Sequence, residues 1–236
     1  MDLHGPCTVL VETIPLSGRD NMCIDANLLN AGIESDQTFL RLYRWERATV
    51  SLGYFQKSEQ FKASGGPLSQ LPTVQRLSGG GAILHEHEWT YTLVTPGSRL
   101  GKQDPLDLYT AVHRSLIEVF ERRGLICQLR GHEAAFDSEQ FLCFGRGDAR
   151  DIVCGTHKVV GSAQRRRRGA VLQHGSILIR HSSLTPQFPG LADLGASGPW
   201  GPEFASEVSC RIIEAFRLEP VSNVTSPEVS KHLTDP

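Results

Sequence analysis

A cysteine and a lysine in this sequence have the side chains and the surroundings that acyl transfer needs. Cys143 stands in the segment FLCFGRG, where the glycines that follow it predict a loop, and Lys158 begins the segment KVVGSAQ. A thiol suits thioester exchange because the attacking group and the leaving group are both sulfur. A lysine among small residues can direct its ammonium into a pocket and stabilise a developing oxyanion. Taken singly, an inert core thiol and a surface lysine on an edge strand are the simpler interpretations.

Three successive glycines form a second candidate element. In the segment RLSGGGA they let the backbone approach a ligand closely and expose amide groups to it. The segment predicts a cradle for an acyl chain, a carboxylate or a phosphate, and a tight hairpin turn is the plainer alternative. No GKS or GKT follows, so this is not a Walker phosphate-binding loop. The candidate binding residues here are Arg76, Ser78, Gly79, Gly80, Gly81 and Ala82.

Two more segments can line the same pocket, although a lone histidine is more often structural than catalytic. One is GSAQ, directly after the lysine strand, and the other is QHGS, across a short basic turn. With the histidine that follows the glycine turn, they add the candidates His85, Gly161, Ser162, Ala163, His174 and Gly175. No Cys/His cluster has zinc-site spacing, so no metal site is predicted.

The run Arg165–Arg168 most simply marks a solvated turn. Its alternative interpretation is a docking patch for an acidic protein partner. No aromatic residues interleave with the arginines, so the run does not predict a nucleic-acid site. The formal net charge of the whole chain is -2, which likewise argues against bulk attraction to nucleic acid or anionic membranes.

The spacing of apolar residues predicts an α+β (mixed α/β) domain, with strands in runs and helices interspersed. Helical spacing favours 19–31, 104–124, where Asp104 and Pro105 start the helix, and about 203–217. Residues 62–72 are turn-rich and predict a loop, as does the stretch 131–150 around Cys143. Strands are expected at 7–14, 39–45, 49–55, on both sides of the glycine turn within 73–96, and at 151–154, 158–164 and 170–180.

Composition places the chain among ordinary globular domains. It has 236 residues, 39% hydrophobic and 21% charged, which suits one domain with a normal core. The six cysteines form no CxxC pair and predict reduced thiols, and no signal-peptide or membrane-helix stretch is apparent. We therefore expect a cytoplasmic protein with a catalytic domain over 1–217 and an unstructured tail over 218–236.

Four segments together resemble the lipoate-protein ligase A and octanoyltransferase branch of the biotin/lipoate protein ligase superfamily. RLSGGGAILHEHEWTYTLV resembles the signature RxSGGGAVxH of that family, and KVVGSAQRRRRGAVLQHGSILI resembles its lysine, GSAQ and QHGSxL element. GRDNMCIDANLL is similar to the opening helix, and TVSLGYFQ to the second strand. The four segments occur in the family's order, and the resemblance runs from about residue 18 to about residue 195.

The resemblance implies a fold, a reaction and partners. The fold would be a large mixed sheet with a smaller sheet and flanking helices, and the acyl chain would lie in a tunnel beneath the glycine turn. Within the family, the pair Cys-Phe at 143–144 and the segment HEHEWTY resemble the cysteine-dependent octanoyltransferases. Ala149-Arg150-Asp151 stands where ligases commonly have Arg-Asn-Asp, and few residues follow the shared region for a ligase's second domain. Cys143 would then be the nucleophile and Lys158 its charged partner.

For such an enzyme, octanoyl-acyl-carrier protein would be the donor, and a lysine of a lipoyl-domain protein would be the acceptor. Acceptors of this kind are the glycine cleavage H protein and the E2 subunits of 2-oxoacid dehydrogenases. The transferase would need no cofactor. An ATP- and Mg-dependent lipoate-protein ligase, an amidotransferase that moves lipoyl groups between proteins, and a non-catalytic acyl-binding relative remain as alternatives.

Overall fold

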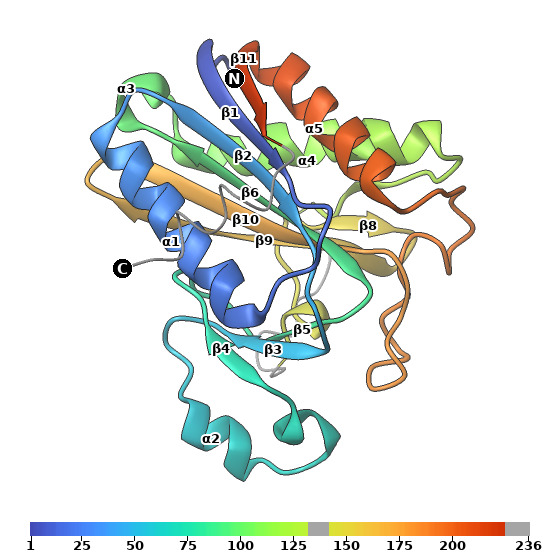
Figure 1. The fold of residues 1–236 in the computed structure, drawn as a ribbon. Coiled ribbons are helices and arrows are strands. Elements are labelled where there is room, and N and C mark those ends of the chain that lie inside the picture. Colours follow the sequence, from blue (N-terminus) through green and yellow to red (C-terminus); the bar gives the residue numbers. More distant parts are fainter. Residues whose placement is uncertain (132–141, 225–236) are drawn as a thin grey trace.

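The computed structural model describes residues 1–131 and 142–224, and within these ranges it contains two β-sheets and flanking helices (Figure 1). The large sheet holds eight described strands, in the spatial order β11-β1-β2-β6-β10-β9-β8-β7, and the small sheet three, in the order β4-β3-β5. The large sheet consists of β1 (Gly5–Val11), β2 (Thr38–Tyr43), β6 (Glu88–Thr95), β7 (Gln128–Leu129), β8 (Ile152–Cys154), β9 (His157–Arg167), β10 (Ala170–Leu178) and β11 (Leu218–Val224). The small sheet consists of β3 (Thr49–Leu52), β4 (Thr73–Gln75) and β5 (Ile83–His85).

The large sheet is mixed, because β1 runs parallel to β2 and β11 whereas the pairs from β2 onward are antiparallel. A large mixed sheet, a smaller sheet and flanking helices confirm the predicted fold class. The helices are α1 (Gly18–Glu34), α2 (Ser58–Ala63), α3 (Gly97–Leu100), α4 (Pro105–Arg122) and α5 (Pro202–Phe216), with the 3-10 turns η1 (Pro67–Gln70) and η2 (Cys143–Gly145).

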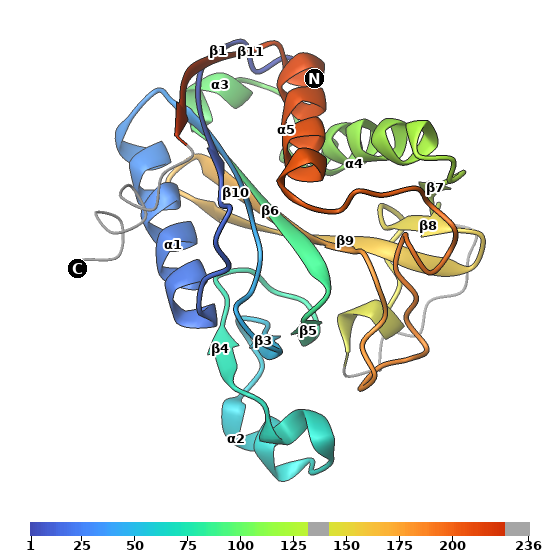
Figure 2. The same cartoon turned by 45° about the vertical axis from the view of Figure 1, so that its right-hand side comes forward.

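Helices cover both faces of the large sheet (Figures 1 and 2). The helices α4 and α5 pack together on one face, over a core that includes Val112, Phe120 and Phe204. On the other face, Ile24 and Leu28 of α1 pack in a smaller core that includes Leu172 of β10. The sheet is therefore buried on both sides, which explains why all nine residues of β10 are buried. No helix in residues 1–131 or 142–224 is long and apolar enough to cross a membrane.

Helices α1 and α4 both begin with an ordinary side-chain cap. The Ser17 hydroxyl accepts a hydrogen bond from the Asp20 amide at the start of α1, and an Asp104 carboxylate oxygen accepts one from the Leu106 amide at the start of α4. Pro105 occupies the first helical position of α4, where its missing N–H costs nothing. The Ser17 cap fixes where α1 begins, and the Asp104 cap with Pro105 fixes where α4 begins.

Several sequence expectations differ from the structure, and the strand expected at 49–55 ends at Leu52. Residues 62–72 are not all loop, because α2 ends at Ala63 and η1 occupies Pro67–Gln70. The arginine run is not all turn, because β9 extends to Arg167 and only Arg168 and Gly169, both with positive φ, make the turn. The tail expected from residue 218 begins later, because Leu218–Val224 form β11, which pairs with β1 along the sheet edge. The rest of that predicted tail, 225–236, lies outside the described residues.

Candidate active site

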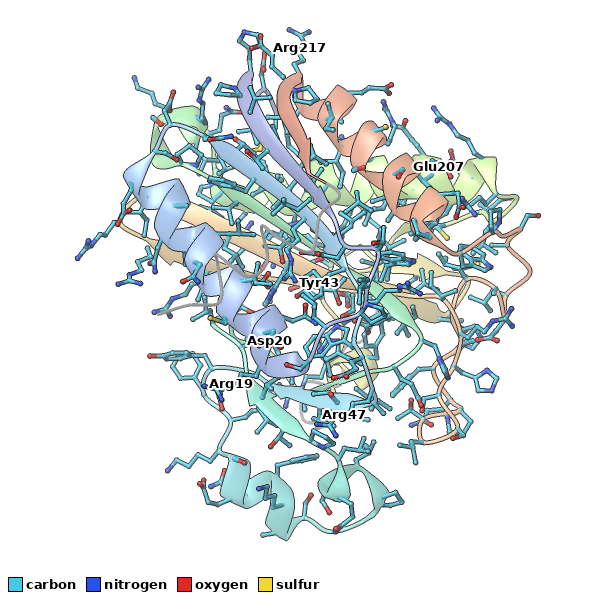
Figure 3. All side chains as sticks on the ribbon, in the orientation of Figure 1. Arg19, Asp20, Tyr43, Arg47, Glu207 and Arg217 are labelled. Carbon is cyan, nitrogen blue, oxygen red and sulfur yellow. The ribbon has the colours of Figure 1, made fainter. Side chains whose placement is uncertain are left out.

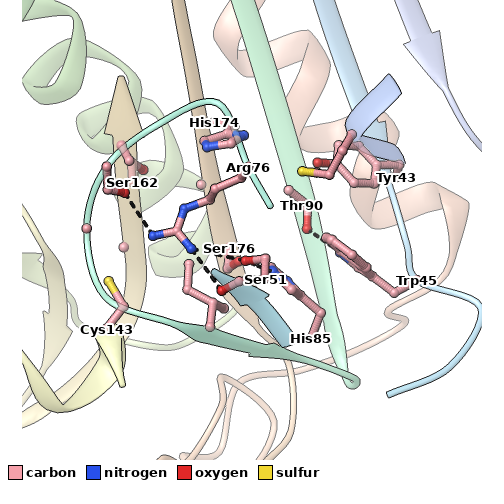
Figure 4. Close-up of a pocket in the computed structure, with 17 residues that line it drawn as sticks. Tyr43, Trp45, Ser51, Arg76, His85, Thr90, Cys143, Ser162, His174 and Ser176 are labelled. Atoms are coloured by element: carbon pink, nitrogen blue, oxygen red, sulfur yellow. Dashed lines mark hydrogen bonds between the residues drawn. The ribbon is translucent and has the colours of Figure 1, made fainter. Parts of the chain in front are cut away.

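A pocket lies where the small sheet and the glycine turn meet the large sheet (Figure 4). The figure shows Cys143 on the side of β9, and Tyr43 and Trp45 on the other side of the cavity. Tyr43 is fully buried and lies deep in the molecule near α1 (Figure 3). The lining is mixed, with apolar and aromatic side chains and a few buried polar groups, as in most small-molecule sites. The lining residues are Met22, Tyr43, Trp45, Ser51, Arg76, Gly79, Gly80, Ile83, His85, Thr90, Cys143, Gly161, Ser162, Ala163, His174, Gly175 and Ser176.

Cys143 and Lys158 meet at the edge of this pocket. Cys143 sits in η2 and is partly exposed, while the Lys158 side chain is only 4% exposed. The Lys158 Nζ lies 3.8 Å from the Cys143 Sγ and donates a hydrogen bond to the Cys143 carbonyl oxygen at 3.1 Å. It also pairs with an Asp151 carboxylate oxygen at 3.0 Å, and burial raises the pKa of Asp151 although Lys158 opposes that effect. The ammonium is therefore held beside the sulfur by fixed contacts on two sides.

Gly161 explains how the lysine reaches that position. A Cβ atom on Gly161 would lie 2.6 Å from the Lys158 Cε and 3.0 Å from its Nζ. Because heavy atoms of this kind do not approach so closely, any side chain at 161 would displace the end of the lysine. The glycine of the GSAQ segment therefore leaves room for the catalytic candidate as well as lining the pocket.

Arg76 holds the glycine turn in shape. Its guanidinium donates to the carbonyl oxygens of Gly79 at 2.8 Å and Gly81 at 2.6 Å, and to the carbonyl and hydroxyl oxygens of Ser51 at 3.0 and 3.1 Å. Burial lowers the pKa of Arg76 to about 10, so the group is still a cation near neutral pH. The arginine thus ties the turn to β3. Gly80 has a φ of 95°, a conformation that suits glycine.

A buried chain of polar contacts joins α1 to the glycine turn through His174. The Asp25 carboxylate accepts a hydrogen bond from the His174 Nδ1 at 3.2 Å, and the Nε2 of the same ring faces the Ser78 hydroxyl. Burial alone would raise the pKa of Asp25, but the hydrogen bond from His174 and the charge of Arg41 hold it below its usual value. Asp25 is therefore ionised and fixes the His174 ring, whose Nε2 then accepts from Ser78.

A second buried histidine lies under the opposite wall of the pocket. The His85 ring stacks on Trp45, with 3.8 Å between the ring centroids. Its Nδ1 donates to Glu88 at 2.6 Å, and its Nε2 contacts the Ser51 hydroxyl at 2.7 Å. Burial lowers the pKa of His85 in spite of the neighbouring Glu88. This ring therefore supports the pocket wall as a neutral group.

The hydroxyl of Ser162 points away from the pocket, to the α4 side of the sheet. It bonds the Tyr91 hydroxyl at 2.6 Å and the His113 Nε2 at 2.7 Å. Gln173 donates to Tyr91 at 2.8 Å, and Gln164 donates to Gln173 at 3.0 Å. Gln164 of GSAQ and Gln173 of QHGS thus bond each other behind the pocket, and Ser162 is linked to Gln173 through Tyr91, which ties β9 to β10 there.

Most of the predicted site residues come together in this pocket. Of those named from the sequence, Cys143, Arg76, Gly79, Gly80, His85, Gly161, Ser162, Ala163, His174 and Gly175 line it. Four others do not line the pocket: Lys158, Ser78, Gly81 and Ala82. Lys158 contacts the lining residue Cys143, and Ser78 contacts the lining residue His174. Sequence reasoning missed seven lining residues: Met22, Tyr43, Trp45, Ser51, Ile83, Thr90 and Ser176.

Strand alternation offers a signal for some of the missed residues. Tyr43 and Trp45 are two positions apart, as are His174 and Ser176, and residues at that spacing point to the same face of a strand. The other missed residues carry no such signal, because they reach the pocket only through the packing of α1 and the small sheet.

The chain is similar in sequence to octanoyltransferases. The octanoyltransferase LipM of Oceanobacillus iheyensis is 31% identical over 170 residues, which cover 71% of this chain and 62% of the relative. The LipM of Carboxydothermus hydrogenoformans is 34% identical over 178 residues, which cover 72% of this chain and 64% of the relative. The chain therefore spans less than two thirds of the length of these relatives.

Solved structures share the fold. Protein Ta0514 of T. acidophilum, determined with bound lipoic acid, superposes with a TM-score of 0.72 at 19% identity, over 99% of this chain and 93% of that one. A lipoate-protein ligase A bound with ATP also gives a TM-score of 0.72 at 19% identity, with the same coverage. The family model described as the lipoyl protein ligase A/B catalytic domain matches residues 17–187. With the fold and the four motifs in place, this match shows that the chain belongs to the lipoyl protein ligase A/B catalytic-domain family.

Proposed function

We propose that this protein transfers an octanoyl group onto a lysine of a lipoyl-domain protein through a thioester on Cys143. One observation carries the proposal: the Cys143 Sγ lines the pocket and lies 3.8 Å from the buried Lys158 Nζ. A thiol beside a fixed cation, at the edge of a pocket lined partly by apolar and aromatic side chains, suits covalent attack on an acyl thioester. The names of the LipM relatives support octanoyl transfer as the reaction class.

The proposed first step exchanges one thioester for another. The Cys143 sulfur attacks the carbonyl carbon of octanoyl-acyl-carrier protein, and the carrier's C–S bond breaks as its thiol leaves with the proton of Cys143. Negative charge develops on the carbonyl oxygen during attack, and the Lys158 ammonium, 3.8 Å from the sulfur, can stabilise it. The octanoyl chain would lie among Tyr43, Trp45 and Ile83.

In the proposed second step, the neutral amine of a lipoyl-domain lysine attacks the octanoyl-Cys143 carbonyl. The new amide forms as the C–S bond breaks, and Cys143 recovers a proton. Both bonds that break are thioester bonds, which are already activated, so this route uses neither ATP nor Mg. Splitting the transfer into two steps predicts ping-pong kinetics.

The test is an intact-mass measurement after mixing the protein with octanoyl-acyl-carrier protein, without ATP. We expect a gain of one octanoyl group that hydroxylamine removes, that Cys143→Ser abolishes, and that Cys154→Ser retains. Cys154 is a suitable control because it is also a partly exposed free thiol and lies outside the pocket. Transfer to the acceptor that proceeds at the normal rate in Cys143→Ser would overturn the covalent route.

The ligase alternative gives a different pattern in the same assay. A lipoate-protein ligase would modify the lipoyl domain only when free octanoate or lipoate and Mg-ATP are supplied, and would be indifferent to Cys143. An amidotransferase would form the same acyl-Cys143 from an already acylated protein, and not from the carrier. Comparing the three donors therefore separates the three reactions.

A further inference from the structure

Two exposed aromatic side chains stand on the loop that follows β3. Tyr54 is 48% exposed and Phe55 is 85% exposed, and their rings meet edge to face with 5.1 Å between centroids. The Tyr54 amide donates to the Ser78 carbonyl oxygen at 2.9 Å. The aromatic pair is therefore attached to the glycine turn of the pocket, and is not a distant surface feature.

Two arginines of β9 extend the same surface. The Arg165 guanidinium lies 4.8 Å from the centroid of the Tyr54 ring, a cation–π contact, and Arg167 donates to Asn30 of α1 at 3.1 Å. Because alternate residues of a strand share a face, both arginines lie on the face of β9 that carries Gly161 and Ala163 into the pocket. One strand face thus forms part of the pocket wall and then continues as a basic surface.

Arg166 lies on the opposite face of the same strand. Its guanidinium donates to the Gln164 side chain at 3.3 Å, and Gln164 in turn donates to the Pro105 carbonyl oxygen at the start of α4. The arginine run is therefore divided between the two faces of the sheet. Only part of it adjoins the pocket.

Across residues 1–131 and 142–224, no salt bridge joins a carboxylate to any arginine of the run Arg165–Arg168. The whole chain carries a formal charge of -2, so this concentration of positive charge is local. Exposed aromatic and arginine side chains are the types most enriched where proteins bind one another.

We propose that Tyr54, Phe55, Arg165 and Arg167 form the docking surface for an acidic protein domain that presents the acyl thioester to the pocket. The inference rests on the proposed function, because it names where the donor binds. Guanidinium groups can bind carboxylates in two-point contacts, and Phe55 supplies an apolar anchor at their side. Electrostatic attraction of this kind should weaken as salt increases.

The test compares two octanoyl donors, octanoyl-acyl-carrier protein and the small thioester octanoyl-N-acetylcysteamine. We expect Arg165→Glu to lower kcat/KM for Cys143 acylation at least tenfold with the protein donor and to leave the small thioester unaffected. Arg166→Glu is the matched control, because it makes the same charge change one residue away on the opposite face. Phe55→Ser should lower kcat/KM with the protein donor, as Arg165→Glu does. Ile126→Ser, which changes an equally exposed apolar residue elsewhere, should leave it unchanged, as the Arg166→Glu control does.

Each outcome decides the proposal. If kcat/KM falls equally with both donors, these residues act in the catalytic pocket and not in docking. If Arg165→Glu and Arg166→Glu lower kcat/KM equally, the effect depends on net charge and not on this surface. Either result overturns specific docking. If neither donor acylates the wild-type protein, the proposed function fails, and calorimetric binding of the octanoyl carrier then tests docking separately. Binding that Arg165→Glu weakens tenfold and Arg166→Glu does not would support the surface, and no difference would overturn it.

Discussion

The Lys158 Nζ donates a hydrogen bond to the Cys143 carbonyl oxygen at 3.1 Å while it lies 3.8 Å from the sulfur of the same residue. The lysine therefore both anchors the turn that carries the thiol and places a charge beside it. Removal of a preorganised charge of this kind typically costs about 100- to 1000-fold in rate.

We expect Lys158→Met to slow acylation of Cys143 by about 100-fold. The measurement is the single-turnover rate of octanoyl transfer from the carrier, with Lys102→Met as control because Lys102 is an exposed lysine outside the site. Thermal unfolding of both variants shows whether losing the hydrogen bond from Lys158 to the Cys143 carbonyl oxygen also destabilises the fold. A Lys158→Met protein that reacts at the wild-type rate would remove the lysine from the mechanism.

Gly161→Ala should separate activity from stability. The added methyl group clashes with the flexible end of Lys158 and makes an ordinary contact with Asp151 at 3.7 Å, so the lysine moves away from Cys143 and we expect acylation to fall about tenfold or more with little change in Tm. Gly175→Ala is the contrasting variant, since its Cβ would lie 2.2 Å from the Ser162 Oγ and 3.0 Å from the Gly161 carbonyl oxygen. That clash is in the packed sheet and should lower the free energy of unfolding by about 1–3 kcal/mol. Equal Tm losses in the two variants would contradict this distinction.

Two buried histidines should make the fold less stable in mild acid. Burial lowers the pKa of His113 from 6.5 to about 4, and burial also lowers the pKa of His85. Between about pH 4 and 6.5 the unfolded chain binds protons that the folded chain does not, so the free energy of unfolding decreases as the pH falls through this range. His113 alone contributes at most about 3 kcal/mol to that loss.

Urea unfolding at a series of pH values measures this effect. His113→Gln should flatten the fall in stability between pH 6.5 and 4, because the group that titrates on unfolding is gone. His4→Gln serves as control, as it removes a histidine whose side chain is 67% exposed. If His113→Gln keeps the full slope, the buried His113 is not its source.

The thiols of Cys127 and Cys154 should form a disulfide on mild oxidation. Gln128 pairs with Val153 and Leu129 with Ile152, so the same register sets Cys127 opposite Cys154. The Arg130 amide bonds the Asp151 carbonyl oxygen at 2.9 Å, and alternation then makes the cysteines a non-hydrogen-bonded pair. Cα atoms in such pairs are about 4.5 Å apart, within the range that disulfides span.

Oxidised glutathione is the reagent of choice for this test. Burial raises the pKa of Cys127 to about 12, so the partly exposed Cys154 should attack the glutathione disulfide first, and Cys127 should then displace the second glutathione. Peptide mapping should find the two cysteines joined. The Tm should rise by roughly 6–12 °C, if closing a loop of this size contributes about 3 kcal/mol. A glutathione adduct that persists on Cys154 would show that the thiols cannot meet.

The sequence predicts the parts of this protein that depend on local pattern. Helical spacing locates α1, α4 and α5, because each buries one face, and short runs of apolar and β-branched residues locate the central strands, which are buried on both faces. It does not predict β11, since LEPVSNV has no clear alternation and forms a strand only because β1 leaves an open edge beside it. The helix α2 and the turn η1 are too short to show a period.

The site divides in the same way. Cys143, Lys158 and the glycine turn are visible as short motifs, and the structure brings them together. Tyr43, Trp45 and Met22 are not, because an aromatic or apolar residue in a strand or helix is ordinarily core. Alternation puts Tyr43 and Trp45 on the same strand face. That this face meets a pocket follows from the packing of α1 and the small sheet, which no local pattern specifies.

The length of β9 has a consequence for the choice of donor. Lys158 and Arg165 lie on this one strand, and at about 3.3 Å per residue their backbones are about 23 Å apart. A partner held at the arginine end must carry its reactive carbon on a flexible arm of similar reach, whatever its affinity for the surface. If the proposed docking holds, the length of β9 therefore favours donors that carry the acyl group on a flexible arm.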